Sequence, residues 1–187
     1  MILGDNIFYG AGLGEFVQHA ANGGGGATVF CHWMNNPGRY GILEFDIGGL
    51  PVHIQEKPKQ PKSNWAVTGL YFYDSSIVEV ARKLKPSARG ELEITDANRA
   101  YLQAGRLSAQ KLGRGLAWFD ANTHHSLLQA SEFIYTIEER QGLKIGCPEE
   151  VAYRMGFIDA ATVERLVEPI ADSDYGSYLR RVLNSQA

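Results

Sequence analysis

The sequence predicts an α/β protein in which a mixed sheet is followed by a helical C-terminal appendage. Over residues 1–125, short segments rich in β-branched and aromatic residues alternate with helical patterns, which is typical of strands with interleaved helices. From residue 126 onwards, apolar residues recur at helical spacing instead. The 187 residues, 44% of them hydrophobic, are enough to bury one sizeable core.

The first half of the chain predicts strands around one helix. Met1–Leu3 is short and apolar and precedes a Gly-Asp-Asn turn, so we expect it to be the end of a buried strand. The four-glycine run at residues 23–26 ends the next helix and forms a surface turn. The segments predicted up to residue 56 are a helix at 13–21, a strand at 27–33, a loop at 35–38, and a hairpin of strands at 41–46 and 51–56.

The second half begins after a proline-containing linker at residues 58–62. It predicts a strand at 66–73, helices at 76–84 and 94–104, strands at 107–112 and 115–119, a helix that starts at 126 and ends at Gly142, and shorter helices at 148–155 and 160–168. We therefore expect one part at residues 1–125 and a helical part at 126–187.

Composition narrows the classes of partner. The formal net charge of −3 and the absence of a basic run give no reason to expect nucleic acid or a membrane surface as partner, so a small molecule is favoured. No stretch of about 18 apolar residues and no export signal occurs. Cys31 and Cys147 lie far apart without metal-ligand spacing, which predicts reduced thiols in a cytoplasmic protein.

Two carboxylates follow strand-like segments. Asp5 and Asp120 each stand where a predicted strand ends. Oxygen ligands on rigid elements suit a magnesium ion that bridges phosphate oxygens. Either residue can equally be an ordinary turn or helix N-cap residue.

A carboxylate and two cations could hold a sugar phosphate. Glu56 can accept hydrogen bonds from sugar hydroxyls, while the adjacent Lys57 ammonium can pair with a phosphate. Arg89 precedes a glycine and could clamp phosphate oxygens. The alternatives are a solvated ion pair for the dipeptide and a helix start with acidic residues for the Arg89 segment.

Other motifs favour structural interpretations. The glycine run follows a helix and leads into a strand, which is the wrong order for a phosphate-binding loop. His124 and His125 are adjacent and lack the spacing that lets two histidines share a metal on a helix. Tyr40 and Trp118 can be core aromatics or faces that stack on a sugar.

Taken in order, these segments resemble the glucose-1-phosphate thymidylyltransferase family, and the resemblance covers essentially the whole chain. The segments are Leu3–Gly10 (LGDNIFYG), Arg39–Gly41, Glu56–Pro58, Ala66–Asp74, Arg89–Asp96, Ala117–Asp120 and, in the tail, 137–158. The implied fold is a nucleotidyltransferase-type, Rossmann-like mixed sheet.

The resemblance implies transfer of a thymidylyl group from dTTP to glucose 1-phosphate, giving dTDP-glucose and pyrophosphate, the first step towards dTDP-L-rhamnose. It implies Asp5 and Asp120 as ligands of Mg²⁺, and Asp5, Lys57, Arg89 and Asp120 as the catalytic set. The implied substrate-binding residues are Gly41, Glu56 and Val67 at the glucose ring, Lys57, Arg89 and Tyr71 at its phosphate, and Tyr40 and Trp118 around the sugar-nucleotide site.

The resemblance also assigns the two parts of the chain. Residues 1–125 would be the sugar-phosphate and metal-binding part of the nucleotidyltransferase domain. Residues 126–187 would supply oligomer contacts and a regulatory site, in a homo-oligomer that is a tetramer by resemblance.

Family members carry a further segment before the Leu-Gly-Asp-Asn motif, with a Gly-Gly-x-Gly-Thr-Arg loop and a lysine that grip the nucleotide. The sequence contains neither, so we expect a truncated gene or a misplaced start codon, and no catalysis by these residues alone. One alternative is a non-catalytic remnant that binds a sugar phosphate or another subunit. Another is a sister nucleotidyltransferase using UTP or CTP, which the thymidylyltransferase-like tail argues against.

Overall fold

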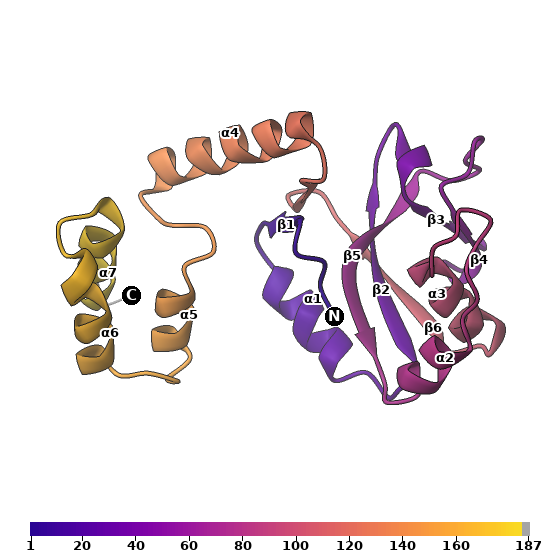
Figure 1. Ribbon diagram of the computed structural model, residues 1–187, viewed down its shortest axis with the longest axis horizontal. Coiled ribbons are helices and arrows are strands. Elements are labelled where there is room, and N and C mark those ends of the chain that lie inside the picture. The colour runs from indigo at the N-terminus through magenta and orange to yellow at the C-terminus, as the bar shows by residue number, and fades with distance from the viewer. Residues whose placement is uncertain (185–187) are drawn as a thin grey trace. The chain divides into compact units, whose positions relative to one another are not determined.

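The structure is a computed structural model that describes residues 1–184 (Figure 1). Its contacts divide the chain into two compact units, with the boundary between Leu127 and Leu128, inside helix α4 (His124–Gln141). This division lies two residues after the boundary expected from the sequence. We call the two units the sheet unit and the helical unit.

A five-stranded mixed sheet forms the centre of the sheet unit. Its strands, in spatial order, are β4 (Pro51–Glu56), β3 (Gly41–Phe45), β5 (Trp65–Tyr73), β2 (Ala27–Trp33) and β6 (Leu107–Leu112). β2 and β6 are parallel and the other neighbours are antiparallel. The predicted α/β class and mixed sheet are therefore confirmed, with most strand bounds within one residue of the prediction.

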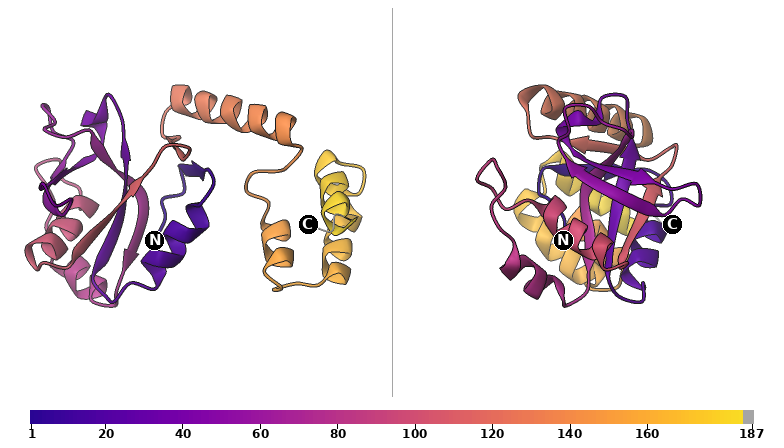
Figure 2. Two further views of the ribbon diagram at one scale, coloured as in Figure 1. Left: turned by 180° about the vertical axis from the view of Figure 1, so that it is seen from behind. Right: turned by 90° about the vertical axis from the view of Figure 1, so that its right-hand side faces the viewer.

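Helices cover both faces of this sheet because its strands alternate apolar residues between two sides. Val29 and Cys31 of β2 face a core that includes Tyr101 of α3 (Ile94–Gln103), and α2 (Ile77–Lys83) contacts α3. Phe30, between them, packs with Ala20 of α1 (Leu13–Ala21). Figures 1 and 2 show α1 on one side of the sheet, with α2 and α3 on the other.

Two short strands form a separate pair, and here the prediction for the N-terminus is wrong. Met1–Leu3 is exposed and forms an isolated bridge to β5, with backbone hydrogen bonds to Gly69 and Tyr71, rather than a buried strand. The strand is instead β1 (Asn6–Tyr9), antiparallel to β7 (Ala117–Asp120). β7 starts later than predicted because Gly115 adopts φ 90°, which an extended strand does not allow.

The helices of the second part of the chain match the prediction except for one added helix, α7 (Asp174–Asn184). Helix α4 begins at His124 rather than Ser126 because the side chains of Thr123 and Ser126 each accept a hydrogen bond from the other's backbone N–H. It ends before Gly142, which adopts φ 67° as a C-terminal glycine. The other helices are α5 (Pro148–Arg154), α6 (Ala160–Val167) and the 3₁₀ turn η2 (Glu168–Ile170).

The core of the helical unit joins α5, α6 and α7. Its buried residues are Cys147, Val163, Val167, Tyr178, Leu179 and Val182. Leu179 has no exposed surface, so truncating it creates a cavity.

Leu179→Ala is expected to destabilise the helical unit by about 2–5 kcal/mol, the range for buried leucine truncations. Hydrogen exchange should accelerate in α5 to α7, whereas Leu166→Ala, at an exposed leucine on α6, should have a much smaller effect. Equal protection in the two variants would contradict this core assignment.

Asp74 ties the glycine turn to the end of β5. Its carboxylate accepts hydrogen bonds from the Gly26 backbone, from Ser76 and from the Tyr101 hydroxyl, and it pairs with Arg106. The Ser76 hydroxyl, followed by the Gly26 N–H, holds the pKa of Asp74 well below its ordinary 3.8.

Because this pKa is lowered in the folded state, the ionised Asp74 stabilises the fold above pH about 4, and this contribution is lost as the pH falls further. Asp74→Asn should therefore lower the thermal midpoint at pH 7, and the difference from the wild type should shrink below pH about 4. Thermal unfolding from pH 2 to 7 measures this. A difference that stays constant with pH would contradict it.

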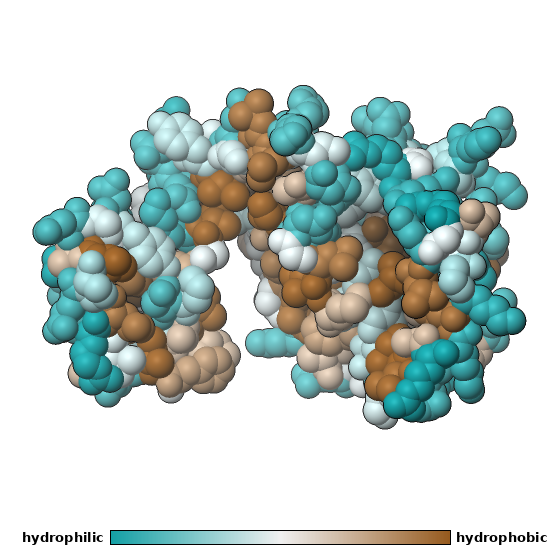
Figure 3. Space-filling view, in the orientation of Figure 1, coloured by the Kyte–Doolittle hydropathy of each residue, from teal (hydrophilic) through white to brown (hydrophobic). Residues whose placement is uncertain are grey.

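Apolar side chains also reach the surface of both units (Figure 3). In the helical unit they include Val151, Met155 and Phe157, the last with 75% of its surface exposed.

Among residues 1–184, no helix combines the length and the apolar character needed to cross a membrane. Cys31 and Cys147 are free cysteines and both are buried.

Candidate functional site

A pocket in the sheet unit collects nearly all of the predicted site residues. Its lining combines the predicted Asp5, Tyr40, Gly41, Glu56, Lys57, Val67, Tyr71, Trp118 and Asp120 with Leu3, Asn6, Arg39, Thr68, Gly69, Ile94, Thr95 and Asn122. Its volume is about 180 Å³. Sites for drug-sized ligands usually measure roughly 300–1,000 Å³, so this smaller pocket matches a ligand of monosaccharide size.

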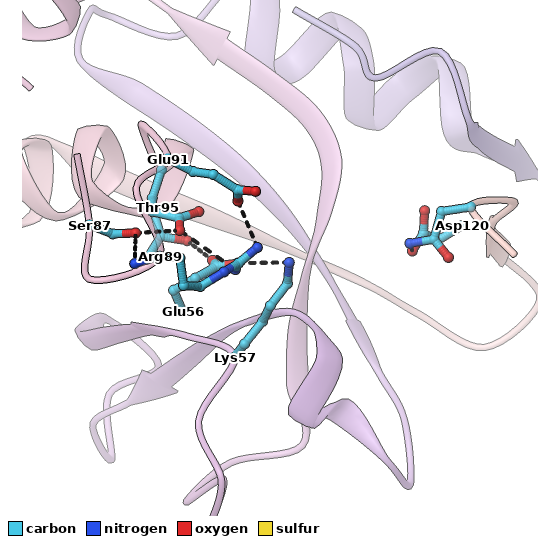
Figure 4. Close-up of polar contacts among 9 residues, drawn as sticks. Glu56, Lys57, Ser87, Arg89, Glu91, Thr95 and Asp120 are labelled. Atoms are coloured by element: carbon cyan, nitrogen blue, oxygen red, sulfur yellow. Dashed lines mark hydrogen bonds and ion pairs between the residues drawn. The ribbon is translucent and has the colours of Figure 1, made fainter. Parts of the chain in front are cut away.

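Glu56, at the end of β4, is the centre of the polar cluster on one side of the pocket (Figure 4). One carboxylate oxygen accepts a hydrogen bond from the buried Thr95 hydroxyl at 2.5 Å. The other lies 3.6 Å from the Lys57 ammonium and 3.8 Å from the Arg89 guanidinium. The carboxylate is thus fixed by one neutral donor and flanked by two cations.

Lys57 has an unusual backbone conformation. It is the only described non-glycine residue with positive φ, at 39°, although Pro58 follows and disfavours compact conformations at the preceding residue. Its N–H donates to the Tyr40 carbonyl, which holds this conformation across the start of β3. Such strain is concentrated at functional sites, and here it directs the ammonium beside Glu56.

Arg89 does not line the pocket, which separates it from the other predicted site residues. Its guanidinium approaches Glu56 and also pairs with Glu91 at 2.7 Å and Glu93 at 3.5 Å. The side chain is 43% exposed, so these ion pairs are weak and exchangeable. A bound anion could therefore draw the guanidinium away from Glu91.

Small and buried residues line the pocket beneath this cluster. A Cβ at Gly41 would lie 2.9 Å from the Thr95 hydroxyl, so glycine leaves room for the contact between Thr95 and Glu56. Val67 and Tyr71 of β5 are buried. Burial, with a smaller contribution from Glu56, raises the pKa of Tyr71, so its hydroxyl stays protonated and able to donate.

Asp5 and Asp120 meet on the other side of the pocket. Asp120 is the last residue of β7 and lies opposite Asn6 in the antiparallel pairing with β1. The Ala121 backbone N–H donates to the Asp5 backbone carbonyl at 2.8 Å. Burial is the largest cause of the raised pKa of Asp120, and the charge of Asp5 raises it further. Asp5 lies in the turn before β1 rather than at the end of a strand.

This carboxylate pair fits a divalent cation by its chemistry. The charge of Asp5 raises the pKa of Asp120, and a cation bound between two such hard oxygen donors would relieve this repulsion. Among residues 1–184, no cluster of three or more His, Cys, Asp or Glu side chains could enclose a metal. Two carboxylates with the remaining positions left to water and substrate phosphate are characteristic of magnesium sites.

Two aromatic rings form the wall between the two sides. The Tyr40 and Trp118 rings lie 5.0 Å apart between centroids, and both line the pocket. The Trp118 indole donates to the Asn6 side chain at 2.6 Å. Both rings therefore line the pocket, and stacking on a sugar stays a prediction.

Sequence reasoning missed five polar lining residues, although each lies in or beside a segment used for the resemblance: Asn6, Arg39, Thr68, Thr95 and Asn122. Arg39 donates to Asn122 at 3.1 Å, and Asn122 donates to Asp120 at 2.7 Å. The Thr95 hydroxyl donates to Glu56, and the Asn6 side chain accepts from the Trp118 indole, as described above. The signal that could have found Asn6 and Asn122 was an amide side chain within two residues of a predicted carboxylate.

Comparison with known proteins shows the family of this chain. The nucleotidyl transferase family model matches residues 1–137. The chain is 55% identical over 179 residues to the glucose-1-phosphate thymidylyltransferase of Xanthomonas campestris pv. campestris, covering 96% of this chain and 61% of that protein. It is 51% identical to the Mycolicibacterium smegmatis enzyme of the same name, covering 100% of this chain and 64% of that protein. The chain thus spans less than two thirds of the length of these relatives.

Solved structures share the fold. A Bacillus anthracis protein described as a glucose-1-phosphate thymidylyltransferase, with sucrose bound, superposes with a TM-score of 0.62 at 43% identity, over 71% of this chain and 52% of that chain. A UDP-glucose pyrophosphorylase with UDP-glucose gives a TM-score of 0.63 at 22% identity, over 72% of this chain and 55% of that chain, which shows the fold alone. Fold, pocket and family match converge: the chain belongs to the nucleotidyl transferase family.

Proposed function

We propose that this chain forms the sugar-phosphate and metal-binding part of a glucose-1-phosphate thymidylyltransferase. The reaction transfers a thymidylyl group from dTTP to glucose 1-phosphate and yields dTDP-glucose and pyrophosphate. An oxygen of the sugar phosphate forms the new bond to the α-phosphorus, and the bond from that phosphorus to pyrophosphate breaks. No protein nucleophile takes part, so positioning and charge neutralisation carry the rate.

The roles of the side chains follow from the pocket. Glu56 accepts hydrogen bonds from glucose hydroxyls, and the wall of Tyr40 and Trp118 excludes water from one side of the sugar. Lys57 and Arg89 pair with the sugar phosphate, and the protonated Tyr71 hydroxyl donates to it. Asp5 and Asp120 hold a divalent cation, which we propose is Mg²⁺ and which, when bound, neutralises charge on the phosphates.

The observation that carries this proposal is the position of Glu56. A carboxylate fixed by Thr95 between the cations Lys57 and Arg89 offers hydroxyl acceptors beside a phosphate clamp. A sugar phosphate carries hydroxyl groups and a phosphate on one small molecule, which matches these two kinds of contact. The names of the relatives at about 50% identity support the same ligand.

Pyrophosphate release from dTTP and glucose 1-phosphate in the presence of Mg²⁺ tests the proposal with the purified chain. We expect any release to disappear in Asp5→Asn and Asp120→Asn. Release that survives both substitutions would show that the metal assignment is wrong. No release from the intact chain, together with saturable binding of glucose 1-phosphate, would favour the non-catalytic module.

Three further properties remain proposals. A role in dTDP-L-rhamnose synthesis and a cytoplasmic location follow from the family resemblance. Assembly into a homo-oligomer through the helical unit follows from the resemblance and is supported by the exposed Val151, Met155 and Phe157, since exposed apolar groups often mark interaction surfaces. Sedimentation of the purified chain would measure the oligomeric state.

A further inference from the structure

Asn6 is the one pocket residue whose side chain joins three separate components of the site. Its amide oxygen accepts hydrogen bonds from the Gly69 N–H of β5 at 2.9 Å and from the Trp118 indole N–H of β7 at 2.6 Å. Its amide nitrogen donates to the Asp5 carboxylate at 2.9 Å. These contacts connect the sheet, the aromatic wall and one of the two metal-binding candidates.

The partners fix which way the amide points. Two of them are N–H groups that can only donate, and the third is a carboxylate that accepts. A reversed amide would place its NH₂ group against two donors and its oxygen against the carboxylate. The side chain therefore has one satisfactory orientation, and this orientation holds Asp5 and Trp118 at a fixed separation.

Gly69 makes this arrangement sterically feasible. A Cβ built on Gly69 would lie 2.6–2.8 Å from all three terminal atoms of the Asn6 side chain, closer than real contacts allow. The same glycine has a negative φ, so backbone conformation does not require it. Its role is to leave the space that Asn6 occupies.

We propose that Asn6 is a positioning residue that orients the Asp5 carboxylate and the Trp118 indole. Position 69 requires glycine because any larger side chain would occupy the space of the Asn6 side chain. The inference rests on the proposed function for its consequence in the reaction, but its structural content does not depend on catalysis. Replacing a residue that hydrogen-bonds to a metal ligand, without contacting the metal itself, typically lowers metal affinity or activity by about 10–100-fold.

Three substitutions separate the contacts. Asn6→Ala removes all of them. Asn6→Asp keeps an acceptor for Gly69 and Trp118, but it replaces the donor to Asp5 by a carboxylate oxygen and adds a negative charge beside Asp5. Gly69→Ala leaves the asparagine in the sequence but fills its space. The control is Asn64→Ala, whose amide bonds the Met34 carbonyl at 2.8 Å and does not line the pocket.

The experiment measures two quantities on the full chain. The first is the indole N–H signal of each of the three tryptophans in ¹⁵N NMR spectra, with Trp118→Phe to assign the signal of Trp118. The second is the affinity for Mn²⁺ alone, measured by electron paramagnetic resonance. Neither quantity requires turnover.

Asn6→Ala and Gly69→Ala are expected to move the Trp118 signal, to speed its exchange with water, and to weaken Mn²⁺ binding by about 10–100-fold. The Trp33 and Trp65 signals should stay in place. Asn6→Asp should restore the Trp118 signal. The double variant Asn6→Ala with Gly69→Ala should resemble either single variant, because both remove the same interaction.

The inference is overturned if the Trp118 signal is unchanged in Asn6→Ala or moves equally in Asn64→Ala. It is also overturned if Mn²⁺ affinity stays constant while the indole signal moves, since Asn6 would then only fasten strands together. Failure of the proposed function would give a different set of results from failure of this inference. The intact chain would then bind no glucose 1-phosphate and release no pyrophosphate, while the NMR and Mn²⁺ comparisons among the variants would still give their expected pattern.

Discussion

Asp120→Asn is expected to weaken binding of Mn²⁺ to the chain by at least about 100-fold when glucose 1-phosphate is present. The pair of carboxylates supplies all the charged protein oxygen ligands proposed for the cation, and losing one is more severe than losing a group that only orients a ligand. Asp5→Asn should have a similar effect. Paramagnetic relaxation of water protons by Mn²⁺ measures both affinities.

The matched control is Asp46→Asn. Asp46 closes the turn between β3 and β4 by accepting the Leu50 N–H at 2.8 Å, and it does not line the pocket. The Asp46→Asn variant should bind Mn²⁺ with the affinity of the wild type. Wild-type affinity in both Asp5→Asn and Asp120→Asn would place the metal elsewhere and remove the central electrostatic element of the proposal.

Glu56→Gln is expected to weaken glucose 1-phosphate binding by about 100-fold. Hydrogen bonds to a charged acceptor contribute about 1.5–3 kcal/mol each, and two to sugar hydroxyls account for that loss. The substitution also frees Lys57 and Arg89 from a carboxylate, which favours phosphate binding. These cations are 46% and 43% exposed, and such ion pairs are worth about 0–1 kcal/mol, so the loss prevails.

Comparison of two ligands makes this prediction specific. Inorganic phosphate, which has no sugar hydroxyl, should bind Glu56→Gln as well as or slightly better than it binds the wild type. The control variant is Glu79→Gln, at an exposed ion pair with Arg82 on α2. If Glu56→Gln lost both ligands equally, Glu56 would act on the phosphate and not on the sugar.

Much of the sheet unit could be predicted from the sequence because its strands alternate apolar residues and are separated by glycine and proline. β2, β4 and β6 have their predicted bounds. The prediction that Met1–Leu3 is buried was wrong because burial depends on what packs against a strand, and local sequence does not contain that information.

Helix α7 shows a different limit of sequence patterns. Glycine is a poor helix former, so Gly176 argues against a helix at Asp174–Asn184. In the structure this glycine is buried, and a Cβ there would lie 2.3 Å from the Ile170 carbonyl oxygen. Close approach of the backbone, a tertiary property, explains why a helix contains it.

The candidate site was only partly predictable, because four charged lining residues were identified, whereas the cation Arg39 and the neutral polar residues were missed. Ordered motifs identified Asp5, Glu56, Lys57 and Asp120, which the structure brings to one pocket. Asn6 and Thr95 were missed because an amide or hydroxyl has no distinctive chemistry until its partners are in place. Their contacts with Trp118 and Glu56 span long separations in sequence.

Calorimetric titration of the intact chain with glucose 1-phosphate tests the central claim most directly, with glucose and inorganic phosphate titrated separately. The pocket predicts one site per chain and binding at least about tenfold tighter than for either separate ligand, because Glu56 and the cations act on the two ends of one molecule. Lys57→Ala should weaken binding of the sugar phosphate and of phosphate alike. The absence of saturable binding, or binding unchanged in both Glu56→Gln and Lys57→Ala, would contradict the assignment of this pocket to a sugar phosphate.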